Sequence, residues 1–329
     1  MIILNEKEIQ ELYEMEQALV DLESMLHHKA ADKIVNPPRT VIEFPEEDGS
    51  VLYMPSTDLD EEMMTMKAVT IFPNNPSRGK STTQGIVLLS DAKNGDHVAM
   101  FNASYLTRLR TGAMSGLATD RLALKDAKTL TMIGTGGMAF EQALGVLAVR
   151  DIKEILLINP TKEKAHNFKE KLRQFGIDLS ISIEILDDVS EAVSASQIVC
   201  CSTRSHEPVF NGKDLLPGTH VNGVGSYLPH MREVDLTFLQ RASKIVVDDL
   251  EGATEEAGEL IHAEQQTDWS FDTIHGDLME LVVNKIAHRE NNEEITFFKS
   301  VGAAYYDLAV ANGVYKIAQK TNAGTKIEI

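Results

Sequence analysis

Residues 134–139 read Gly-Thr-Gly-Gly-Met-Ala and lie between an apolar run, residues 129–133, and a predicted helix, residues 138–149. A G-x-G-x-x-G/A string is weak evidence by itself, but a strand before it and a helix after it give it meaning. Gly134 permits a tight turn, Gly136 lets the backbone approach a pyrophosphate, and the helix directs N–H groups at that anion. We predict a dinucleotide-binding turn, with a ligand-free glycine turn as the alternative.

The strand that follows this turn bears on which dinucleotide would bind. Dinucleotide folds place an acidic residue at the carboxyl end of the second strand, where it holds a ribose 2′-hydroxyl. Here that strand ends at Asn159, whereas Glu154 precedes it and should lie at the wrong end. Lys162 and Lys164 follow closely. NADP therefore fits at least as well as NAD, and the choice between them stays open.

Strand and helix patterns alternate beyond the glycine turn. Predicted strands cover residues 155–158, 181–185, 197–201, 220–224 and 244–247, and predicted helices cover residues 162–175 and 188–195. Repeated strand–helix units with apolar strands are typical of a mostly parallel sheet with helices on both faces. We predict an α/β fold of this doubly wound type for the middle of the chain.

The segment before the turn has a different pattern. An amphipathic helix is predicted from Asn5 to the His27-His28 pair, and short strand-like runs follow at residues 39–44, 51–54, 67–72, 85–90 and 97–102. Turn-rich stretches separate these runs, which is typical of a largely antiparallel meander. Residues 103–124 then form a predicted helix, and the last predicted helix, residues 305–320, should return to this first domain.

Composition limits the class of protein. The 329 residues include 31 Lys and Arg against 50 Asp and Glu, so the formal net charge is −19. This charge repels phosphate backbones and anionic membranes, which argues against a nucleic-acid or membrane partner. The two cysteines, Cys200 and Cys201, are adjacent and cannot staple the fold. With neither a signal-peptide pattern nor an apolar run of membrane length, we expect a cytoplasmic soluble protein.

Isolated basic residues in the first domain are candidates for substrate binding. Arg39 follows two prolines, Lys67 lies in a predicted strand, and Arg110 lies in a predicted helix. Cations that converge on a cleft would orient a small carboxylate, and a lysine in such company has its pKa lowered, which suits acid–base chemistry. Ordinary surface cations are the alternative. The histidines lack metal-ligand spacing, so no metal site is expected.

These residues and several further motifs resemble the ornithine cyclodeaminase/mu-crystallin family. The matches run in order along nearly the whole chain and comprise residues 105–117 with their Arg110-Thr111-Gly112-Ala113 core, residues 134–139, Gly223-Val224-Gly225-Ser226, Pro229, Arg232-Glu233, and Lys299-Ser300-Val301-Gly302. The resemblance implies a Rossmann domain for NAD or NADP, residues 121–304. It also implies an α+β domain, residues 1–120 and 305–329, that binds substrate and forms a homodimer.

The resemblance also implies roles for particular residues. Arg39, Lys67 and Arg110 would bind the substrate carboxylate and amino group, with Val301 nearby, and Lys67 would be the catalytic residue that transfers a proton. The cofactor contacts that the resemblance implies, together with Thr203 at a predicted strand end, are Thr82, Arg110, Thr111, Gly134, Gly136, Gly137, Met138, Asn159, Thr203, Val224, Gly225 and Ser300.

One departure from the family pattern bears on the reaction. Ornithine cyclodeaminases place an aspartate two residues after the strand-end glycine, whereas this chain has Tyr227 there, and the acid expected in the strand of residues 50–53 is also missing. We therefore expect an NAD(P)-dependent oxidoreductase that interconverts an L-amino acid and its imine or 2-oxo acid, such as 1-pyrroline-2-carboxylate or pyruvate. An ornithine cyclodeaminase and a non-catalytic NAD(P)H-binding protein are the alternatives.

Overall fold

The structure is a computed structural model that describes residues 1–328. The chain forms two compact units. Unit 1 joins Met1–Arg110 to the segment that begins at Ala303, and unit 2 contains Thr111–Gly302. The expected domains divide after residue 120 and before residue 305. The first observed boundary, after Arg110, lies instead inside a continuous helix, α3 (Ala103–Leu122). The function assigned to each domain stays a prediction.

Unit 1 is built on an eight-stranded sheet with the order β16-β1-β7-β6-β5-β4-β2, and β3 pairs with β4. Neighbouring strands of this sheet are antiparallel, as the turn-rich sequence predicted, except that β1 and β7 are parallel. The strands are β1 (Ile2–Leu4), β2 (Ile34–Val35), β3 (Thr40–Phe44), β4 (Gly49–Asp58), β5 (Met63–Ile71), β6 (Thr83–Asp91), β7 (His97–Asn102) and β16 (Thr325–Lys326), with short helices η1 (Pro45–Glu47) and η2 (Asn75–Arg78) between them.

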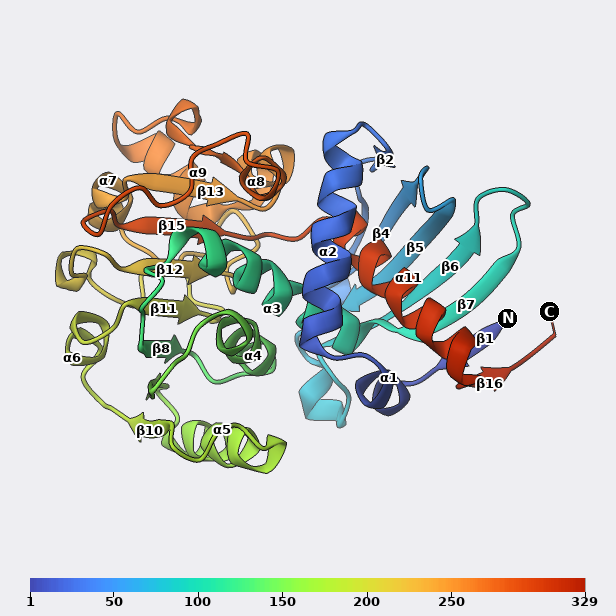
Figure 1. The fold of residues 1–329 in the computed structure, drawn as a ribbon, viewed down its shortest axis with the longest axis horizontal. Helices are drawn as coiled ribbons and strands as arrows, with labels where there is room; N and C mark the ends of the chain where they lie inside the picture. The colour runs from blue at the N-terminus through green and yellow to red at the C-terminus, as the bar shows by residue number, and fades with distance from the viewer. Residues whose placement is uncertain (329) are drawn as a thin grey trace. The chain divides into compact units, whose positions relative to one another are not determined.

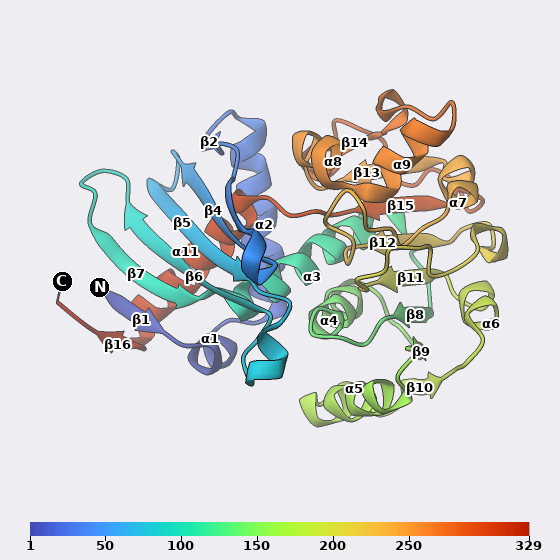
Figure 2. The same ribbon diagram turned by 180° about the vertical axis from the view of Figure 1, so that it is seen from behind.

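Helix α11 (Ala304–Thr321) covers one face of this sheet. It contacts β4, β5 and β6 and packs against α2 (Met15–Ala30), as Figure 1 shows. Lys67 lies on this face, opposite Met54 on one neighbouring strand and Val87 on the other, and all three are buried. Figure 2 shows the other side of the same unit, with strands β4–β7 in front of α11.

The prediction of one continuous N-terminal helix was wrong. The segment forms α1 (Glu6–Leu12) and α2, because Tyr13 adopts an extended conformation between them and Glu14 starts the second helix through a capping box with Gln17. The Tyr13 ring is fully buried and its hydroxyl donates to Asp21 at 2.5 Å. Burying this ring therefore takes precedence over the helical periodicity.

Unit 2 contains the predicted parallel sheet, with the order β10-β9-β8-β11-β12-β15-β13-β14 (Figure 2), and every pair is parallel. Its strands are β8 (Thr129–Ile133), β9 (Glu154–Ile158), β10 (Ser182–Ile185), β11 (Ile198–Cys201), β12 (His220–Gly223), β13 (Lys244–Val247), β14 (Gly276–Asp277) and β15 (Thr296–Lys299). The chain winds outward from β8 in one direction through β9 and β10, and in the other from β11 onward. This doubly wound order confirms the Rossmann fold, and in such folds ligands bind outside the carboxyl ends of the strands where the order reverses, which here are β8 and β11.

Helices connect these strands. They are α4 (Ala139–Val149), α5 (Lys162–Phe175), α6 (Val189–Ser194), α7 (Leu236–Arg241), α8 (Leu250–Glu256), α9 (Gly258–Gln266) and α10 (Leu278–Val282), with short helices η3 (Gly212–Asp214) and η4 (Phe271–Thr273). Gly145 of α4 lies so close to α3 that a Cβ would be 2.0 Å from the Gly112 carbonyl oxygen. Helices α3 and α4 can therefore meet at this point only through glycine. Within residues 1–328, no helix is both long and apolar enough to cross a membrane.

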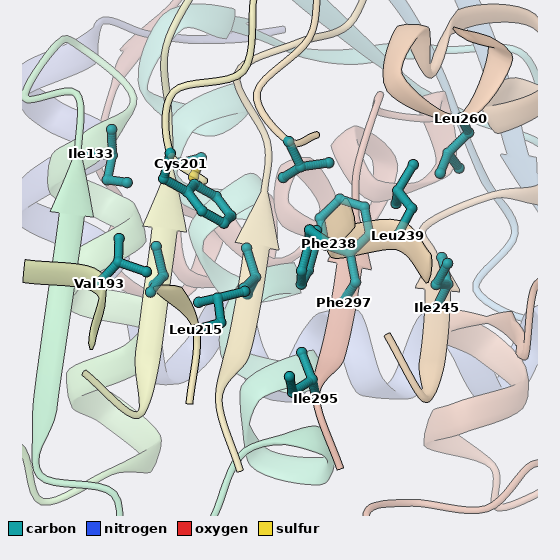
Figure 3. Packing of buried hydrophobic residues seen from close by; sticks show 14 of the residues in the cluster. Ile133, Val193, Cys201, Leu215, Phe238, Leu239, Ile245, Leu260, Ile295 and Phe297 are labelled. Atoms are coloured by element: carbon teal, nitrogen blue, oxygen red, sulfur yellow. The ribbon is translucent and has the colours of Figure 1, made fainter. Parts of the chain in front are cut away.

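The sheet of unit 2 has an apolar core on each face, which also explains the cysteine pair. Cys201 packs in one core with Phe238 and Phe297, as Figure 3 shows, whereas Cys200 belongs to the core on the opposite face. Successive residues of a strand point to opposite faces, so the two thiols are separated by the sheet. Both are buried and free, and burial raises the pKa of Cys200 to about 12.

Candidate functional site

The turn after β8 has the conformation that the glycine string predicted. Gly134 adopts a φ of +88°, and a Cβ there would lie 2.8 Å from Thr203 Cγ2 and 3.0 Å from the Ser202 carbonyl oxygen. Its N–H donates to the Ile158 carbonyl at 2.9 Å, which ties the turn to the end of β9. Only glycine combines this backbone conformation with so close a neighbour.

The next residues of the turn leave space for a ligand. A Cβ built on Gly136 or Gly137 would meet no described atom within 4 Å. Thr135 Oγ1 is buried, and nothing in residues 1–328 hydrogen-bonds to it. Helix α4 starts here, and its N-cap, Met138, offers its free N–H groups no side-chain acceptor. An open glycine turn, a buried hydroxyl and an uncapped helix start together fit a dinucleotide pyrophosphate.

Asn159 lies where the sequence placed it, directly after β9. Its Oδ1 accepts from Thr135 N at 3.4 Å, and its Nδ2 donates to the Thr161 carbonyl at 2.8 Å, so it borders the glycine turn. Glu154 begins β9 and lies at the opposite end, as expected. Lys162 forms an exposed ion pair with Asp187 at 2.8 Å. This pair balances part of the positive charge near Asn159, so the choice between NAD and NADP stays open.

Two further loops of unit 2 hold the remaining predicted cofactor residues. Thr203 follows β11, and Val224 and Gly225 follow β12. The two loops touch, because a Cβ on Gly225 would lie 2.1 Å from the Thr203 carbonyl oxygen. Both loops also hydrogen-bond to the buried carboxylate of Glu233, which belongs to the Arg232-Glu233 motif but was given no role from the sequence.

Ser300 and Val301 form the loop after β15, and a second buried carboxylate organises it. Asp248, which follows β13, accepts from Ser300 Oγ at 2.7 Å, from Val301 N at 3.1 Å and from Gly302 N at 2.6 Å. Burial raises the pKa of Asp248, and these hydrogen bonds act in the opposite direction. Sequence reasoning missed Asp248 because an acidic residue just after a strand is common.

In unit 1 the structure brings the predicted basic residues together around an unpredicted acid. Lys67 of β5 is 3% exposed, and its Nζ donates to both carboxylate oxygens of Asp307 in α11, at 3.1 and 3.0 Å. Arg110 Nε lies 3.5 Å from Asp307 Oδ1. A carboxylate with 0% exposure therefore faces two buried cations.

The electrostatics of Lys67 follow from this arrangement. Burial and the charges of Arg110 and Arg39 lower its pKa, the Asp307 carboxylate acts to raise it, and the net result is a pKa of about 8. Arg39 precedes β3 and is close enough to act on the Lys67 charge. The site can thus attract a small carboxylate through its arginines while its lysine changes protonation state near neutral pH.

Asp307 carries a signal that sequence reasoning could have used. It is the one charged residue in the otherwise uncharged run from Ala303 to Val314. A carboxylate in such a helix is buried only when a cation pairs with it. The sequence does not reveal which cation pairs with Asp307, because Lys67 lies 240 residues away.

The other predicted residues lie as follows. Thr82 precedes β6 in unit 1, and its carbonyl accepts from Phe72 N at 2.8 Å. Thr111 is buried in α3 directly after Arg110, and Tyr227 is half-buried two residues after Gly225. Their roles stay predictions. Across the described part of the chain, no three His, Cys, Asp or Glu side chains are grouped so as to hold a metal ion.

Comparison with known proteins agrees with this geometry. The chain is 38% identical over 329 residues, 100% of both chains, to a Delta(1)-pyrroline-2-carboxylate reductase of Bacillus cereus. A Thermococcus litoralis Delta(1)-pyrroline-2-carboxylate reductase, solved with NADH and L-proline, superimposes with a TM-score of 0.94 at 34% identity, covering 99% of this chain and 100% of that one. An archaeal alanine dehydrogenase dimer with bound NAD gives a TM-score of 0.91 at 32% identity, covering 99% and 98%.

The family comparison covers nearly all of the sequence. Residues 1–322 match the sequence model of the ornithine cyclodeaminase/mu-crystallin family. This range includes the glycine turn, the three predicted cations and Asp307, and it agrees with the resemblance found in the sequence motifs. The chain is therefore a member of the ornithine cyclodeaminase/mu-crystallin family.

Proposed function

We propose that the chain is an NAD(P)-dependent oxidoreductase that interconverts a cyclic imine, 1-pyrroline-2-carboxylate, and the corresponding L-amino acid. The buried Lys67, paired with Asp307 and flanked by Arg39 and Arg110, is the observation that carries the proposal. The Delta(1)-pyrroline-2-carboxylate reductase of Bacillus cereus is 38% identical to this chain over the full length of both. Alanine and pyruvate form the second substrate pair, because a dehydrogenase for alanine is 32% identical.

In the proposed reaction the side chains of unit 1 bind and orient the substrate. Arg39 and Arg110 pair with its carboxylate, since a guanidinium can donate two parallel hydrogen bonds to two oxygens. The Lys67 ammonium donates to the imine nitrogen and delivers the proton that this nitrogen gains on reduction. Asp307 keeps that ammonium in place, and because it is buried it does so without competition from water.

Unit 2 contributes the dinucleotide site in this proposal. The candidate residues are Gly134, Gly136, Gly137, Met138 and Asn159 for the pyrophosphate and adenosine side, and Thr203, Val224, Gly225 and Ser300 for the nicotinamide side. A bound nicotinamide dinucleotide supplies the hydride in reduction and accepts it in oxidation. Positioning and charge stabilisation by the protein account for most of the rate.

Ornithine cyclisation is less well supported. The family resemblance implies an aspartate for that reaction where this chain has Tyr227. A phenol at this position does not supply the carboxylate that the resemblance implies for ring closure.

We also propose that the chain forms a homodimer through the uncovered face of the unit 1 sheet. This face carries large apolar side chains that remain well exposed, among them Met66 (40%), Ile86 (46%) and Phe44 (42%). Exposed apolar side chains on neighbouring strands of one sheet face are typical of a protein interface. The alanine dehydrogenase structure named above is described as a dimer.

The test is an assay of the purified protein. NADH or NADPH is mixed with 1-pyrroline-2-carboxylate, or with pyruvate and ammonia, and cofactor oxidation is followed by absorbance. We expect turnover with the cyclic imine and formation of proline. Release of proline and ammonia from ornithine without net cofactor change would identify a cyclodeaminase instead. Binding of NAD(P)H with no turnover of any imine or 2-oxo acid would leave a non-catalytic binding protein.

A further inference from the structure

The side chain of Glu233 accepts four hydrogen bonds from two strand-end loops of unit 2. Its Oε1 accepts from Thr203 N at 2.5 Å and from Thr203 Oγ1 at 2.8 Å. Its Oε2 accepts from Gly225 N at 2.8 Å and from Ser226 N at 3.3 Å. One carboxylate thus joins the loop after β11 to the loop after β12.

This carboxylate has no contact with solvent. Glu233 is 0% exposed, and burial raises its pKa, while the nearby charge of Lys299 and the N–H donors of Thr203 and Gly225 lower it. A buried carboxylate is costly unless several donors and a cation compensate it. An apolar side chain could fill this volume, but it would leave the N–H groups of Thr203 and Gly225 without an acceptor. The carboxylate is therefore present to accept these hydrogen bonds.

A second set of buried charges holds the same loop from the other side. Lys299, also 0% exposed, donates to Ser226 Oγ at 2.6 Å and to the Ser226 carbonyl, and lies 3.1 Å from Glu259 Oε1. Glu259 in turn accepts from Ser226 Oγ at 3.0 and 2.9 Å. Residues 225 and 226 are therefore fixed between two carboxylates.

The loop that Glu233 holds is packed against the glycine turn. Thr203 lies against Gly134 on one side and against Gly225 on the other, so closely that a Cβ on either glycine would come within 3 Å of it. Ser202 Oγ also donates to the Gly134 carbonyl at 3.0 Å. A shift of the Thr203 loop would consequently change the shape of the crevice beside the turn.

We infer that Glu233 is a positioning residue for the nicotinamide half of the cofactor: it sets the separation of the loops after β11 and β12 through Thr203 and Gly225. The inference rests on the proposed function, which assigns these loops to the nicotinamide. The adenosine and pyrophosphate half depends on Gly136, Gly137 and Asn159, none of which hydrogen-bonds to Glu233 among the contacts of residues 1–328.

The experiment separates the two halves by titrating Glu233→Gln with NADH and with ADP-ribose, which lacks the nicotinamide. The glutamine keeps the shape but offers an N–H₂ group to donors that need an acceptor. We expect NADH affinity to fall about tenfold or more while ADP-ribose affinity changes by less than about twofold. If the unaltered chain prefers NADPH, the pair becomes NADPH and 2′-phospho-ADP-ribose.

Asp235→Asn is the matched control. Asp235 lies two residues further along the same segment and accepts from Phe238 N in the first turn of α7 and from Gly212 N at the start of η3, not from the strand-end loops. It should change both affinities equally or not at all. Glu233→Asp, which keeps the carboxylate but shortens its reach to the two loops, should act like Glu233→Gln but more weakly, and serves if the first variant does not fold.

An equal loss of NADH and ADP-ribose affinity in Glu233→Gln and in Glu233→Asp, or no loss of either, would overturn the inference and leave Glu233 a structural cross-link. That result would not touch the proposed function, because the unaltered chain would still bind NADH. Failure of the unaltered chain to bind NADH or NADPH would remove the proposed function and the inference with it.

Discussion

At the scale of single residues, Lys67 is a cation in surroundings that disfavour its charge. Burial and the charges of Arg110 and Arg39 lower its pKa to about 8, against the opposing effect of Asp307. The ammonium and the free amine are thus both accessible near neutral pH, which is the condition for a residue that gives or takes a proton during turnover. An exposed lysine at its ordinary pKa would remain protonated throughout.

Replacing Lys67 by Met tests this role. Methionine fills a similar volume without a proton, so we expect kcat for imine reduction to fall by about 10²–10⁴. NADH affinity should stay within about twofold, because Lys67 belongs to unit 1 and the glycine turn to unit 2. Steady-state kinetics and fluorescence titration measure the two quantities. A variant that retains full turnover would show that the proton comes from another group.

Replacing Asp307 by Asn tests the pairing. Asp307 raises the pKa of Lys67, so its removal lowers that pKa. In the reductive direction the protonated lysine is the active form, and the rate falls as pH rises through the Lys67 pKa. The descending limb of the pH–rate profile, expected near pH 8 in the unaltered chain, should therefore move to lower pH. An unchanged limb in Asp307→Asn would mean that another group controls it.

Residue types alone indicated part of this site. Isolated cations among apolar and turn residues pointed to Arg39, Lys67 and Arg110, and the structure places them near one another in unit 1. Asp307 was not predicted, and Glu233, although part of the Arg232-Glu233 motif, was given no role, because the donors to a buried acid come from other parts of the chain. The separation of Lys67 from Asp307, 240 residues, shows why no local pattern could reveal the pair.

At the scale of elements, the sequence located some strands and helices to the residue and missed or merged others. Strand β8 and helix α5 have the bounds that the sequence indicated, whereas β15 was missed and the first helix is divided at Tyr13. The apolar run of β8 ends at the glycine turn, and the buried residues of α5, Ala165, Phe168 and Leu172, recur at helical spacing. A break such as that at Tyr13 depends instead on tertiary burial of one ring, which a local pattern does not contain.

The turn between β8 and α4 allows a paired prediction at this scale. Gly134→Ala places a Cβ at a φ of +88° and 2.8 Å from Thr203 Cγ2, so we expect a stability loss of at least about 1–2 kcal/mol together with weaker NADH binding. Gly136→Ala meets no described atom within 4 Å and should keep the stability but block the pyrophosphate. Urea unfolding and NADH titration measure both effects. Equal stability losses in the two variants would contradict this reading of the turn.

At the scale of the whole molecule, the path of the chain explains how the substrate residues are assembled. The chain builds the sheet of unit 1, forms unit 2 after Arg110, and returns to unit 1 at Ala303 as α11. Helix α11 brings Asp307 to the buried face of β5, where Lys67 lies. The two charges that pair in unit 1 therefore come from segments on either side of unit 2 in the sequence. A cut at either unit boundary would leave Lys67 and Asp307 on different fragments.

The opposite face of the same sheet carries the last prediction. Met66 and Ile86 lie on neighbouring strands with 40% and 46% of their surface exposed, and the proposed homodimer would bury them. Changing both to Glu places like charges in that interface, which costs several kcal/mol. We expect a monomer at micromolar concentration where the unaltered chain is a dimer, as measured by sedimentation velocity. Val20→Glu, at an exposed position on α2, should leave the mass unchanged. A doubly substituted chain that still sediments as a dimer would place the interface on another surface.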